Sequence, residues 1–477
     1  MTDNAAVNFK AVLEKIFKAY DIRGIYPDPL NEQVAWKIGH ASASFLRSLI
    51  SGYARSERTA NSMVVGRDAR LSSVSLQNAL IEGISTTGTD TIDIGLIDSP
   101  MLTFAVNHLG VCGGVQVTAS HNPANYNGFK ISGQAGKPVG KESGLWEIKR
   151  IAEAVSVHKA SSPVRRFERD LWPAYREFIR GFLDTDLRPL KVVVDASNGS
   201  AGKMIPAVFS DLPITIVPVN FAPLGVFAHD PNPMLESSLV QIRQVIAAEH
   251  ADFGVCLDGD ADRCIFIDEQ SNPIHCDLIT ALLTPLFLAR QPGATVVFDV
   301  RSSRVIPEEI LKAGGVPKRE RVGHSFIKKA MAENNGVFAG EGSGHFYFKD
   351  NWYADSGALA LVYMLNVVSR SREPLSRMIR PLQRYATSGE LNFHNDRQDE
   401  TIAQLQDEYS RAAKAAGQSC TVDTQDGLRI DFDDWWFNVR KSNTEPLLRL
   451  NAEAKTADLL AARMAELTPK LGQPEAH

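Results

Sequence analysis

The sequence predicts an α/β protein in which three similar mixed α/β domains with mostly parallel sheets, followed by a C-terminal α+β domain, surround a central cleft. The chain has 477 residues, which is too long for a single hydrophobic core. Short apolar runs alternate with segments of helical periodicity, as is typical of parallel sheets covered by helices. This alternation starts three times, and each time a strand runs into a polar loop.

The first predicted domain covers residues 1–160. The segment K-A-Y-D-I-R-G at 18–24 opens its ordered part, and its last strands flank the polar loop T-A-S-H-N-P at 118–123. Ser72 or Ser73 caps its second helix, which ends at residue 84. The other expected elements are a helix over 34–50 and strands over 63–66, 91–95, 115–117 and 129–131.

The second predicted domain covers residues 161–270. It begins in a polar and basic segment, 155–169, which we interpret as a linker. Its polar loop is D-G-D-A-D-R at 258–263, placed directly between two apolar runs. The expected elements are helices over 172–183 and 235–248 and strands over 191–195, 253–257 and 264–268.

The third predicted domain, residues 271–385, contains the loop G-E-G-S-G-H at 340–345. The fourth, residues 386–477, has three consecutive β-like runs between two helices, which indicates an α+β domain. Its polar loop is R-K-S-N-T-E-P at 440–446. The expected elements are helices over 277–288, 325–333, 401–416 and 457–467 and strands over 295–300, 336–339, 428–432, 435–440 and 447–453.

Composition excludes several classes of protein. The net charge of −5 argues against a nucleic-acid partner. The polar, acidic N-terminus does not resemble a signal peptide, and the most apolar stretch, 278–289, contains Pro285 and is too short to span a membrane. Five cysteines without a C-x-x-C pair predict reduced thiols in a cytoplasmic protein.

Ser120 is the candidate nucleophile because it lies in a turn-rich loop at the end of an apolar strand, where α/β proteins bind ligands. His121 cannot be its triad base, since neighbours on an extended chain point to opposite sides. The surrounding residues also lack the G-x-S-x-G pattern of α/β hydrolases. Ser120 therefore needs a metal ion or a phosphoryl group for activation, unless the loop is an ordinary polar turn.

Asp258, Asp260 and Asp262 would share one face of an extended chain and repel one another unless a cation lies among them. Oxygen ligands alone suit a hard ion such as Mg2+. An EF-hand does not fit, because Arg263 stands where its turn needs glycine and the flanks resemble strands. Arg263 also replaces the Thr or Val of D-x-D-x-[TV] phosphatases. A solvated acidic loop is the remaining alternative.

The loops at 440–446 and 340–345 offer groups for a phosphorylated sugar. Arg440, Lys441, two hydroxyls, an amide and backbone N–H groups suit a phosphate dianion. Glu341, Ser343 and His345 can hydrogen-bond to sugar hydroxyls. Ordinary polar turns would have similar sequences. Neither a dinucleotide fingerprint nor a Walker A motif is present, so nothing indicates NAD or ATP.

Taken together, five motifs in order resemble the α-D-phosphohexomutases, and most closely the bacterial phosphomannomutases and the dual phosphomannomutase/phosphoglucomutases. The resemblance covers residues 17–453. The motifs are K-A-Y-D-I-R-G (18–24), T-A-S-H-N-P (118–123), D-G-D-A-D-R (258–263), G-E-G-S-G-H (340–345) and R-K-S-N-T-E-P (440–446).

The resemblance implies a role for each matching residue. Ser120 is the serine that becomes phosphorylated, and Lys130 is the general acid/base, provided that neighbouring cations lower its pKa. One Mg2+ ion is held by Asp258, Asp260, Asp262 and a phosphoserine oxygen. The groups around the transferring phosphoryl are Tyr20, Arg23, His121 and Arg263. The substrate-binding residues are Arg301, His324, Glu341, Ser343, His345, Arg440, Ser442, Asn443 and Thr444.

The implied activity is that of a phosphomannomutase, with action on glucose phosphates as a second implied activity. It interconverts hexose 6-phosphate and hexose 1-phosphate through the phosphoserine and a bisphosphorylated sugar, and a hexose 1,6-bisphosphate is the activator. The partner is a small phosphosugar, with no nucleic acid and no membrane, and the protein is a monomer or a homodimer. The alternatives are a phosphoglucosamine mutase and a non-catalytic sugar-phosphate-binding relative.

Overall fold

The computed structural model describes residues 9–50, 56–160, 164–442 and 447–475. The chain divides into two compact units, each made of two segments. Unit 1 contains Met1–Ile274 and Ser343–Ser376, and unit 2 contains His275–Gly342 and Arg377–His477. Within the described residues, no helix combines the length and the apolar character needed to cross a membrane.

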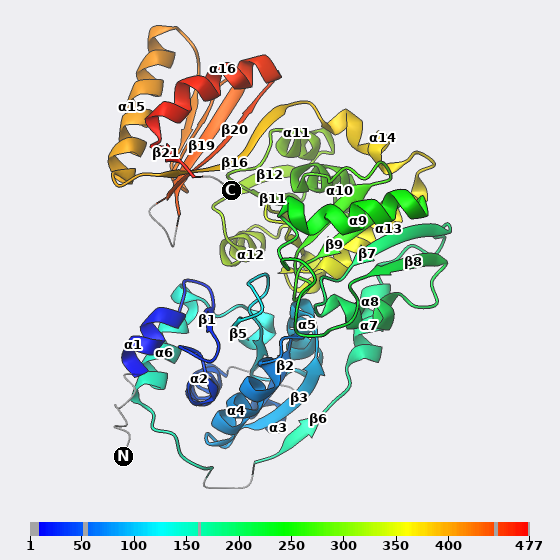
Figure 1. Ribbon diagram of the computed structural model, residues 1–477, viewed down its shortest axis with the longest axis vertical. Coiled ribbons are helices and arrows are strands. Elements are labelled where there is room, and N and C mark those ends of the chain that lie inside the picture. The colour runs from blue at the N-terminus through cyan, green and yellow to red at the C-terminus, as the bar shows by residue number, and fades with distance from the viewer. Residues whose placement is uncertain (1–8, 51–55, 161–163, 443–446, 476–477) are drawn as a thin grey trace. The chain divides into compact units, whose positions relative to one another are not determined.

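The first sheet of unit 1 has the strand order β1-β5-β4-β2-β3-β6 (Figure 1). Strands β4, β2, β3 and β6 are parallel neighbours, whereas β5 runs antiparallel to β4 and to β1. The strands are β1 (Ile22–Ile25), β2 (Ser62–Arg67), β3 (Asp90–Leu96), β4 (Gly113–Val117), β5 (Tyr126–Ser132) and β6 (Arg166–Glu168). The helices of this region are α1 (Phe9–Ile16), α2 (Glu32–Ser48), α3 (Glu57–Ala60), α4 (Ser73–Ser85), α5 (Ser99–Leu109) and α6 (Leu145–Ala154).

Helices cover both faces of this sheet. Successive strand residues point to opposite faces, and two glycines of β4 show what lies on each. A Cβ on Gly113 would meet Leu46 of α2, whereas a Cβ on Gly114 would meet Leu102 of α5. A core cluster of unit 1 packs α2, α4 and α6 against the first of these faces. The predicted alternation of strands and helices is confirmed here.

The second sheet of unit 1 has the order β10-β9-β7-β8. Strand β7 is parallel to β8 and β9, and β10 returns antiparallel to β9. Its strands are β7 (Leu190–Asp195), β8 (Ile214–Val219), β9 (Phe253–Leu257) and β10 (Cys264–Asp268). The other elements of unit 1 are α7 (Trp172–Arg180), α8 (Ala201–Phe209), α9 (Glu236–Glu249), β14 (Phe346–Phe348), β15 (Ala354–Asp355) and α13 (Gly357–Arg370).

The predicted linker at 155–169 is wrong in its last part, because β6 pairs in parallel with β3. Two basic residues of this segment form ion pairs with the neighbouring strand. Arg165 donates to Asp90 (2.7 Å) and Arg166 donates to Asp93 (2.5 Å) on the neighbouring strand. Cross-strand pairs of opposite charge stabilise an edge strand whose sequence is too polar to be recognised as a strand.

Unit 2 begins with a parallel arrangement in which β11 pairs with both β12 and β13. Helix α10 packs on β13, where a Cβ on Gly340 would meet Thr280. The elements are α10 (Cys276–Arg290), β11 (Thr295–Asp299), α11 (Val305–Lys312), β12 (Val316–Glu320), α12 (His324–Glu333) and β13 (Phe338–Gly340). Helix α14 (Leu375–Ile379) follows α13 in the chain.

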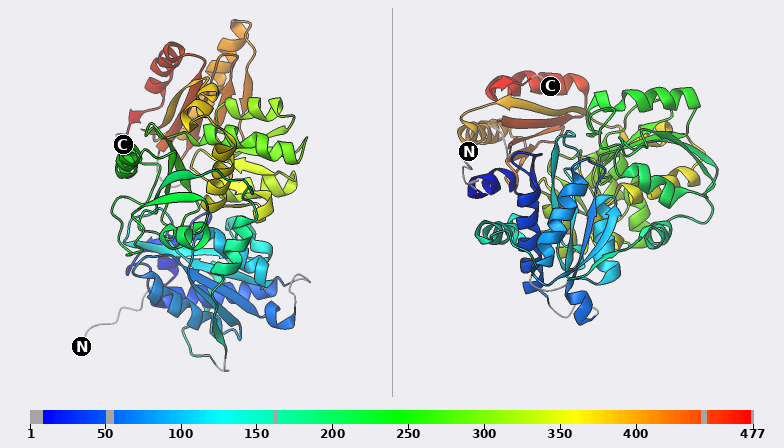
Figure 2. Two further views of the ribbon diagram at one scale, coloured as in Figure 1. Left: turned by 90° about the vertical axis from the view of Figure 1, so that its right-hand side faces the viewer. Right: turned by 60° about the horizontal axis from the view of Figure 1, so that its bottom comes forward.

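The C-terminal sheet of unit 2 is antiparallel, with the order β17-β18-β19-β20-β16-β21. Helices α15 and α16 contribute to one apolar cluster with its strands, and Figure 2 shows α16, in red, lying over them. The predicted α+β character is thus confirmed. The elements are β16 (Ala386–His394), α15 (Gln398–Ala415), β17 (Thr421–Asp423), β18 (Leu428–Asp431), β19 (Trp435–Lys441), β20 (Leu447–Ala454), α16 (Ala457–Leu467) and β21 (Gln473–Pro474).

Candidate active site

Ser120 lies in the loop between β4 and β5 and is almost fully buried. Its backbone has φ 51°, in the left-handed region that a serine rarely adopts. The Ser120 N–H donates to Thr118 Oγ1 (2.9 Å), and the Ser120 hydroxyl donates to Asp258 Oδ2 (2.9 Å). A strained backbone that is fixed by hydrogen bonds is typical of a functional loop.

Asp258, Asp260 and Asp262 lie in the turn between the antiparallel strands β9 and β10 and are all buried. One carboxylate oxygen from each lies within 4.8 Å of the other two. Gly259 is required within this turn, because a Cβ there would lie 2.6 Å from the Ser120 carbonyl oxygen. The absent side chain lets the acidic turn approach the serine loop, so the sequence motif and the nucleophile are brought together.

These carboxylates fit a divalent ion. Burial raises the pKa of Asp258, and the charges of Asp262 and Asp260 raise it further, so positive charge is needed here. Asp260 Oδ1 is buried and has no hydrogen-bond partner among the described residues. The donor set consists of hard oxygen atoms, as Mg2+ prefers. The chemistry of the residues therefore agrees with the predicted Mg2+ ligands.

Lys130, on β5, lies directly against this acidic turn. Its ammonium nitrogen donates to Asp260 Oδ2 (2.7 Å) and to Asp262 Oδ2 (2.5 Å). Burial lowers the pKa of Lys130, but the carboxylates of Asp260, Asp262 and Asp258 outweigh burial and raise it. The role predicted for Lys130 requires neighbouring cations that lower this pKa. The closest charges are acidic, so the ammonium form is favoured in this arrangement.

Three further predicted residues surround Ser120. His121 Nδ1 lies 3.3 Å from the Ser120 hydroxyl, and burial together with Arg263 and Arg23 holds the pKa of His121 well below its usual value. Arg23, on β1, donates to Asn122 Oδ1 (2.5 Å) and pairs with Asp21. Arg23 and Arg263 thus place two positive charges close to His121 and the Ser120 loop.

Arg263 is linked by hydrogen bonds to two further residues of unit 1. Its Nε donates to His345 Nε2 (3.2 Å), and His345 Nδ1 lies 2.9 Å from the Ser343 hydroxyl. The structure thus brings Ser343 and His345 to Arg263. Tyr20 is half-buried and lies just before β1.

Unit 2 contains a separate cluster of arginines around Glu390. Arg440 donates to Glu390 Oε2 (2.8 Å), Arg449 to Oε1 (3.1 Å) and Arg301 to Oε2 (3.4 Å). Burial raises the pKa of Glu390, but Arg301, Arg440 and Arg449 outweigh burial and lower it to about 2. Arg301 is also paired with Asp299 (2.8 Å). Three guanidinium groups around one carboxylate form an anion-binding environment.

Arg449 was not identified from the sequence. It lies on β20 directly opposite Arg440 on β19, and it approaches the Ser442 hydroxyl at 3.5 Å. The hairpin that joins these two strands contains the predicted phosphate loop. A signal was available, because a second arginine just after a phosphate-type loop can return to it across a hairpin. Asn443 and Thr444 lie outside the described residues.

The predicted sugar loop is divided between the two units. Glu341 belongs to unit 2 and accepts from the backbone N–H of Gly323 (3.0 Å), immediately before His324 at the start of α12. Glu341 and His324 are therefore neighbours through Gly323. Ser343 and His345 belong to unit 1.

Ser99 is a further site residue that sequence analysis missed. It begins α5, and its hydroxyl donates to Asp260 Oδ2 (2.5 Å) while its N–H donates to the Asp260 carbonyl (2.9 Å). No local motif marks it, because it meets the acidic turn only after the chain has folded.

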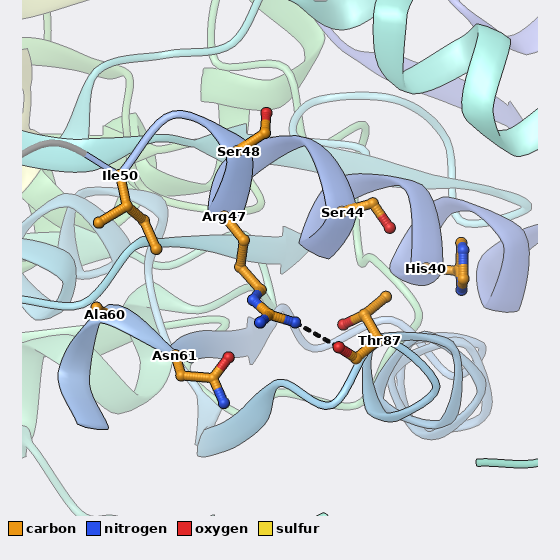
Figure 3. Close-up of a pocket in the computed structure, with 8 residues that line it drawn as sticks. All are labelled: His40, Ser44, Arg47, Ser48, Ile50, Ala60, Asn61 and Thr87. Atoms are coloured by element: carbon orange, nitrogen blue, oxygen red, sulfur yellow. Dashed lines mark hydrogen bonds between the residues drawn. The ribbon is translucent and has the colours of Figure 1, made fainter. Parts of the chain in front are cut away.

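A cavity of about 630 Å3 in unit 1 lies away from these residues. Figure 3 shows it beside the C-terminal half of α2, where Arg47 donates to the Thr87 carbonyl oxygen. None of the predicted site residues lines it. The candidate site residues therefore lie outside this cavity, in one cluster around Ser120 in unit 1 and another around Glu390 in unit 2.

The chain is similar to known proteins over nearly its whole length. The chain matches four consecutive domains of one family: phosphoglucomutase/phosphomannomutase α/β/α domain I at residues 14–158, domain II at 174–271, domain III at 276–385 and the C-terminal domain at 390–470. A phosphomannomutase of Escherichia coli strain K12 is 36% identical over 468 residues, which cover 96% of this chain and 99% of the relative.

Two further relatives span nearly the same length. A protein of Xanthomonas campestris pv. campestris strain B100 described as "Phosphohexose mutases" is 38% identical over 456 residues, with 95% of this chain and 98% of the relative covered. A crystal structure of a phosphoglucomutase/phosphomannomutase family protein from Burkholderia thailandensis superposes with a TM-score of 0.85 at 32% identity, covering 96% and 97% of the two chains. This chain therefore belongs to the phosphoglucomutase/phosphomannomutase family, the α-D-phosphohexomutases, and is by reaction class an isomerase that transfers phosphoryl groups within one sugar.

Proposed function

We propose that this protein interconverts mannose 6-phosphate and mannose 1-phosphate, and also accepts the glucose phosphates. The main support is one contact: the Ser120 hydroxyl lies 2.9 Å from Asp258, the first member of the buried carboxylate triplet. A serine next to hard oxygen ligands can carry a phosphoryl group that a metal ion helps to neutralise. The phosphomannomutases among the relatives support mannose as the sugar.

The proposed first step transfers a phosphoryl group from phospho-Ser120 to the free hydroxyl of the hexose phosphate. The hydroxyl oxygen forms a bond to phosphorus, its proton passes to the neutral amine of Lys130, and the electron pair of the broken P–O bond stays on Ser120 Oγ. That neutral amine requires a cation on Asp260 and Asp262, because without one these carboxylates favour the ammonium form. In the second step, Ser120 takes the other phosphoryl group from the bisphosphorylated sugar. Lys130, as the ammonium that its carboxylate neighbours favour, then returns the proton to the sugar oxygen.

Other residues of unit 1 orient the transferring group. We assign four residues to the oxygen atoms of the transferring phosphoryl group: Arg23, His121, Arg263 and Tyr20. Arg23 and His121 contact the Ser120 loop directly. Asp258, Asp260 and Asp262, with an oxygen of the phosphoserine, would hold one Mg2+ ion. When bound, that ion supplies positive charge that offsets the phosphoryl oxygens and the buried carboxylates.

Unit 2 is proposed to hold the rest of the substrate. Arg440, with Ser442, Asn443 and Thr444, would grip the phosphate that does not react, and Arg301 and Arg449 would assist them. Glu341 and His324 in unit 2, and Ser343 and His345 in unit 1, are assigned to sugar hydroxyls.

The remaining sequence-based expectations are part of this proposal. We propose four domains, with boundaries at residues 160, 270 and 385, and a hexose 1,6-bisphosphate as activator. The protein would act in the cytoplasm as a monomer or homodimer. The cysteines among the described residues are free thiols, and four of the five are buried.

The sugar is tested by coupled assays with mannose 1-phosphate, glucose 1-phosphate and glucosamine 6-phosphate, each with Mg2+ and the matching bisphosphate. We expect the highest kcat/KM for mannose 1-phosphate, measurable turnover of glucose 1-phosphate, and loss of activity with a chelator that added Mg2+ reverses. A preference for glucosamine 6-phosphate would establish the phosphoglucosamine mutase instead. Absence of turnover with all three substrates would support the non-catalytic relative.

A further inference from the structure

Arg70 is a buried cation next to the Ser120 loop whose role the proposed reaction does not explain. It lies in the connection between β2 and α4 and is only 1% exposed. Its Nε donates to Asp68 Oδ2 (3.0 Å), and the ring of Phe227 lies 5.0 Å from its guanidinium carbon. The guanidinium is therefore enclosed by protein, and its interactions are with protein groups rather than with solvent.

The other four N–H groups of Arg70 all point at carbonyl oxygens of the loop that carries Ser120. Its two terminal nitrogens each donate to two of them, so all five donors of the guanidinium are satisfied. The four acceptors are the carbonyl oxygens of Ser120 (2.8 Å), Asn122 (2.6 Å), Pro123 (2.6 Å) and Tyr126 (3.1 Å). One planar side chain thus determines the path of the loop from the nucleophile to the start of β5.

Asp68 connects this contact to the other side of Ser120. The carboxylate that pairs with Arg70 also accepts from the Thr118 hydroxyl (2.8 Å), and Thr118 Oγ1 in turn accepts from the Ser120 N–H (2.9 Å). The N–H and the carbonyl of Ser120 are therefore both held by one network. This explains how a serine can be kept at φ 51°, a conformation that a free loop would avoid.

We propose that Arg70 is a positioning residue for phosphoryl transfer, which fixes the backbone of Ser120 so that its oxygen stays in line beside the acidic turn. The inference rests on the proposed mutase function. Arg70 does not touch the reacting atoms and acts only through the loop. Because transfer is sensitive to displacements of about 1 Å, a loosened loop should slow the chemical step. Substrate affinity should change little, since the assigned phosphate clamp lies in unit 2.

The test compares Arg70→Lys with wild type in the mutase assay. Lysine keeps the charge that Asp68 requires but has three donors on one nitrogen, so it cannot reproduce the planar set of five contacts. We expect kcat to fall about 10- to 100-fold, as for a small misplacement of a reacting group, and KM to stay within about threefold. The rate of a single phosphoryl transfer from a hexose 1,6-bisphosphate to the enzyme should fall by the same factor as kcat.

The matched control is Arg180→Lys, since Arg180 in α7 also donates to backbone carbonyls, those of Val208 and Ser210, but lies outside the site. The Arg180→Lys variant should keep wild-type kcat even though its melting temperature changes by about as much as that of Arg70→Lys.

If Arg70→Lys does not fold, Thr118→Val removes the other half of the network and should lower kcat in the same way, without a matching change in KM. Equal kcat in Arg70→Lys and the control, or in Thr118→Val and wild type, would overturn the inference while leaving the mutase function intact. Absence of turnover in wild type would refute the proposed function itself.

Discussion

In unit 2, the carboxylate of one residue, Glu390, keeps a cluster of anion-binding arginines in place. Glu390 accepts hydrogen bonds from Arg301, Arg440 and Arg449. It lies directly after a register shift in β16, where Gly389 has φ 65°. The carboxylate holds three mutually repelling guanidinium groups in place. A bound phosphate would add negative charge to the same donors, so both the cations and the carboxylate should matter, in different ways.

Replacing Arg440 by Ala should weaken substrate binding. The loss of a hydrogen bond to a charged group corresponds to about 1.5–3 kcal/mol, or a rise in KM of roughly 10- to 150-fold. Steady-state kinetics with mannose 1-phosphate measures it, with Arg463→Ala as a control on α16, where the arginine pairs with Glu466. An unchanged KM in the Arg440 variant would contradict the assigned clamp.

Replacing Glu390 by Gln should destabilise the protein in a pH-dependent way. The pKa of Glu390 is lowered to about 2 in the folded protein, against about 4.3 for an unperturbed glutamate. A lowered carboxyl pKa stabilises the fold fully above the unfolded value, and this contribution disappears as pH falls through 4 toward 2. We expect the variant to be about 1–3 kcal/mol less stable at pH 7, with a smaller difference at pH 3.

Thermal unfolding at several pH values provides this measurement, with Glu400→Gln as the control because Glu400 forms an exposed pair with Arg397. A difference between wild type and Glu390→Gln that stays constant from pH 7 to pH 3 would show that the carboxylate charge is not what the three arginines require.

At the scale of elements, sequence periodicity predicted most strands that end in site loops. Helix α13 was missed because it is apolar almost all round, and 12 of its residues are buried. Such a helix has no polar face to reveal its 3.6-residue period. Strand β6 was missed for the opposite reason, since its polar residues are stabilised by partners on β3 that the sequence does not reveal.

The segment between β8 and α9 offers an element-scale prediction. His229 in this segment lies between the Asp230 carbonyl (2.7 Å from Nδ1) and Asp195 Oδ2 at the end of β7 (3.1 Å from Nε2). Two acceptors favour the doubly protonated ring. Burial lowers the pKa of His229, but these hydrogen bonds outweigh burial and raise it. The pair thus fastens the segment to β7 when the imidazole is charged.

We expect His229→Gln to lower the free energy of unfolding by about 1.5–3 kcal/mol at low pH, the range for a hydrogen bond to a charged group. A raised histidine pKa contributes stability that is complete below the unfolded value near 6.5 and is lost as pH rises through the folded value. Urea unfolding at pH 5.5 and pH 9 should therefore show a larger effect of the substitution at pH 5.5. An equal or larger effect at pH 9 would contradict a charged pair.

At the scale of the whole molecule, the candidate site residues are divided between the two units. Unit 1 contains Ser120, the acidic turn and Lys130, and unit 2 contains the arginine cluster and Glu341. The sequence identified nearly all of these residues, because each sits in a short motif. It could not identify Arg70, Ser99 or Arg449, which reach their partners only through folding. It also misjudged the surroundings of Lys130, since charge neighbours depend on tertiary contacts.

Ser120 is proposed to carry the transferred phosphoryl group, and peptide mass spectrometry can detect that group on the protein. Wild-type protein incubated with a hexose 1,6-bisphosphate should gain one phosphoryl group on the peptide that contains Ser120, and subsequent hexose monophosphate should remove it. Ser120→Ala should fold normally, gain no phosphoryl group and show no turnover. Wild-type turnover in Ser120→Ala, or an exchangeable phosphoryl group on a different residue, would contradict the account.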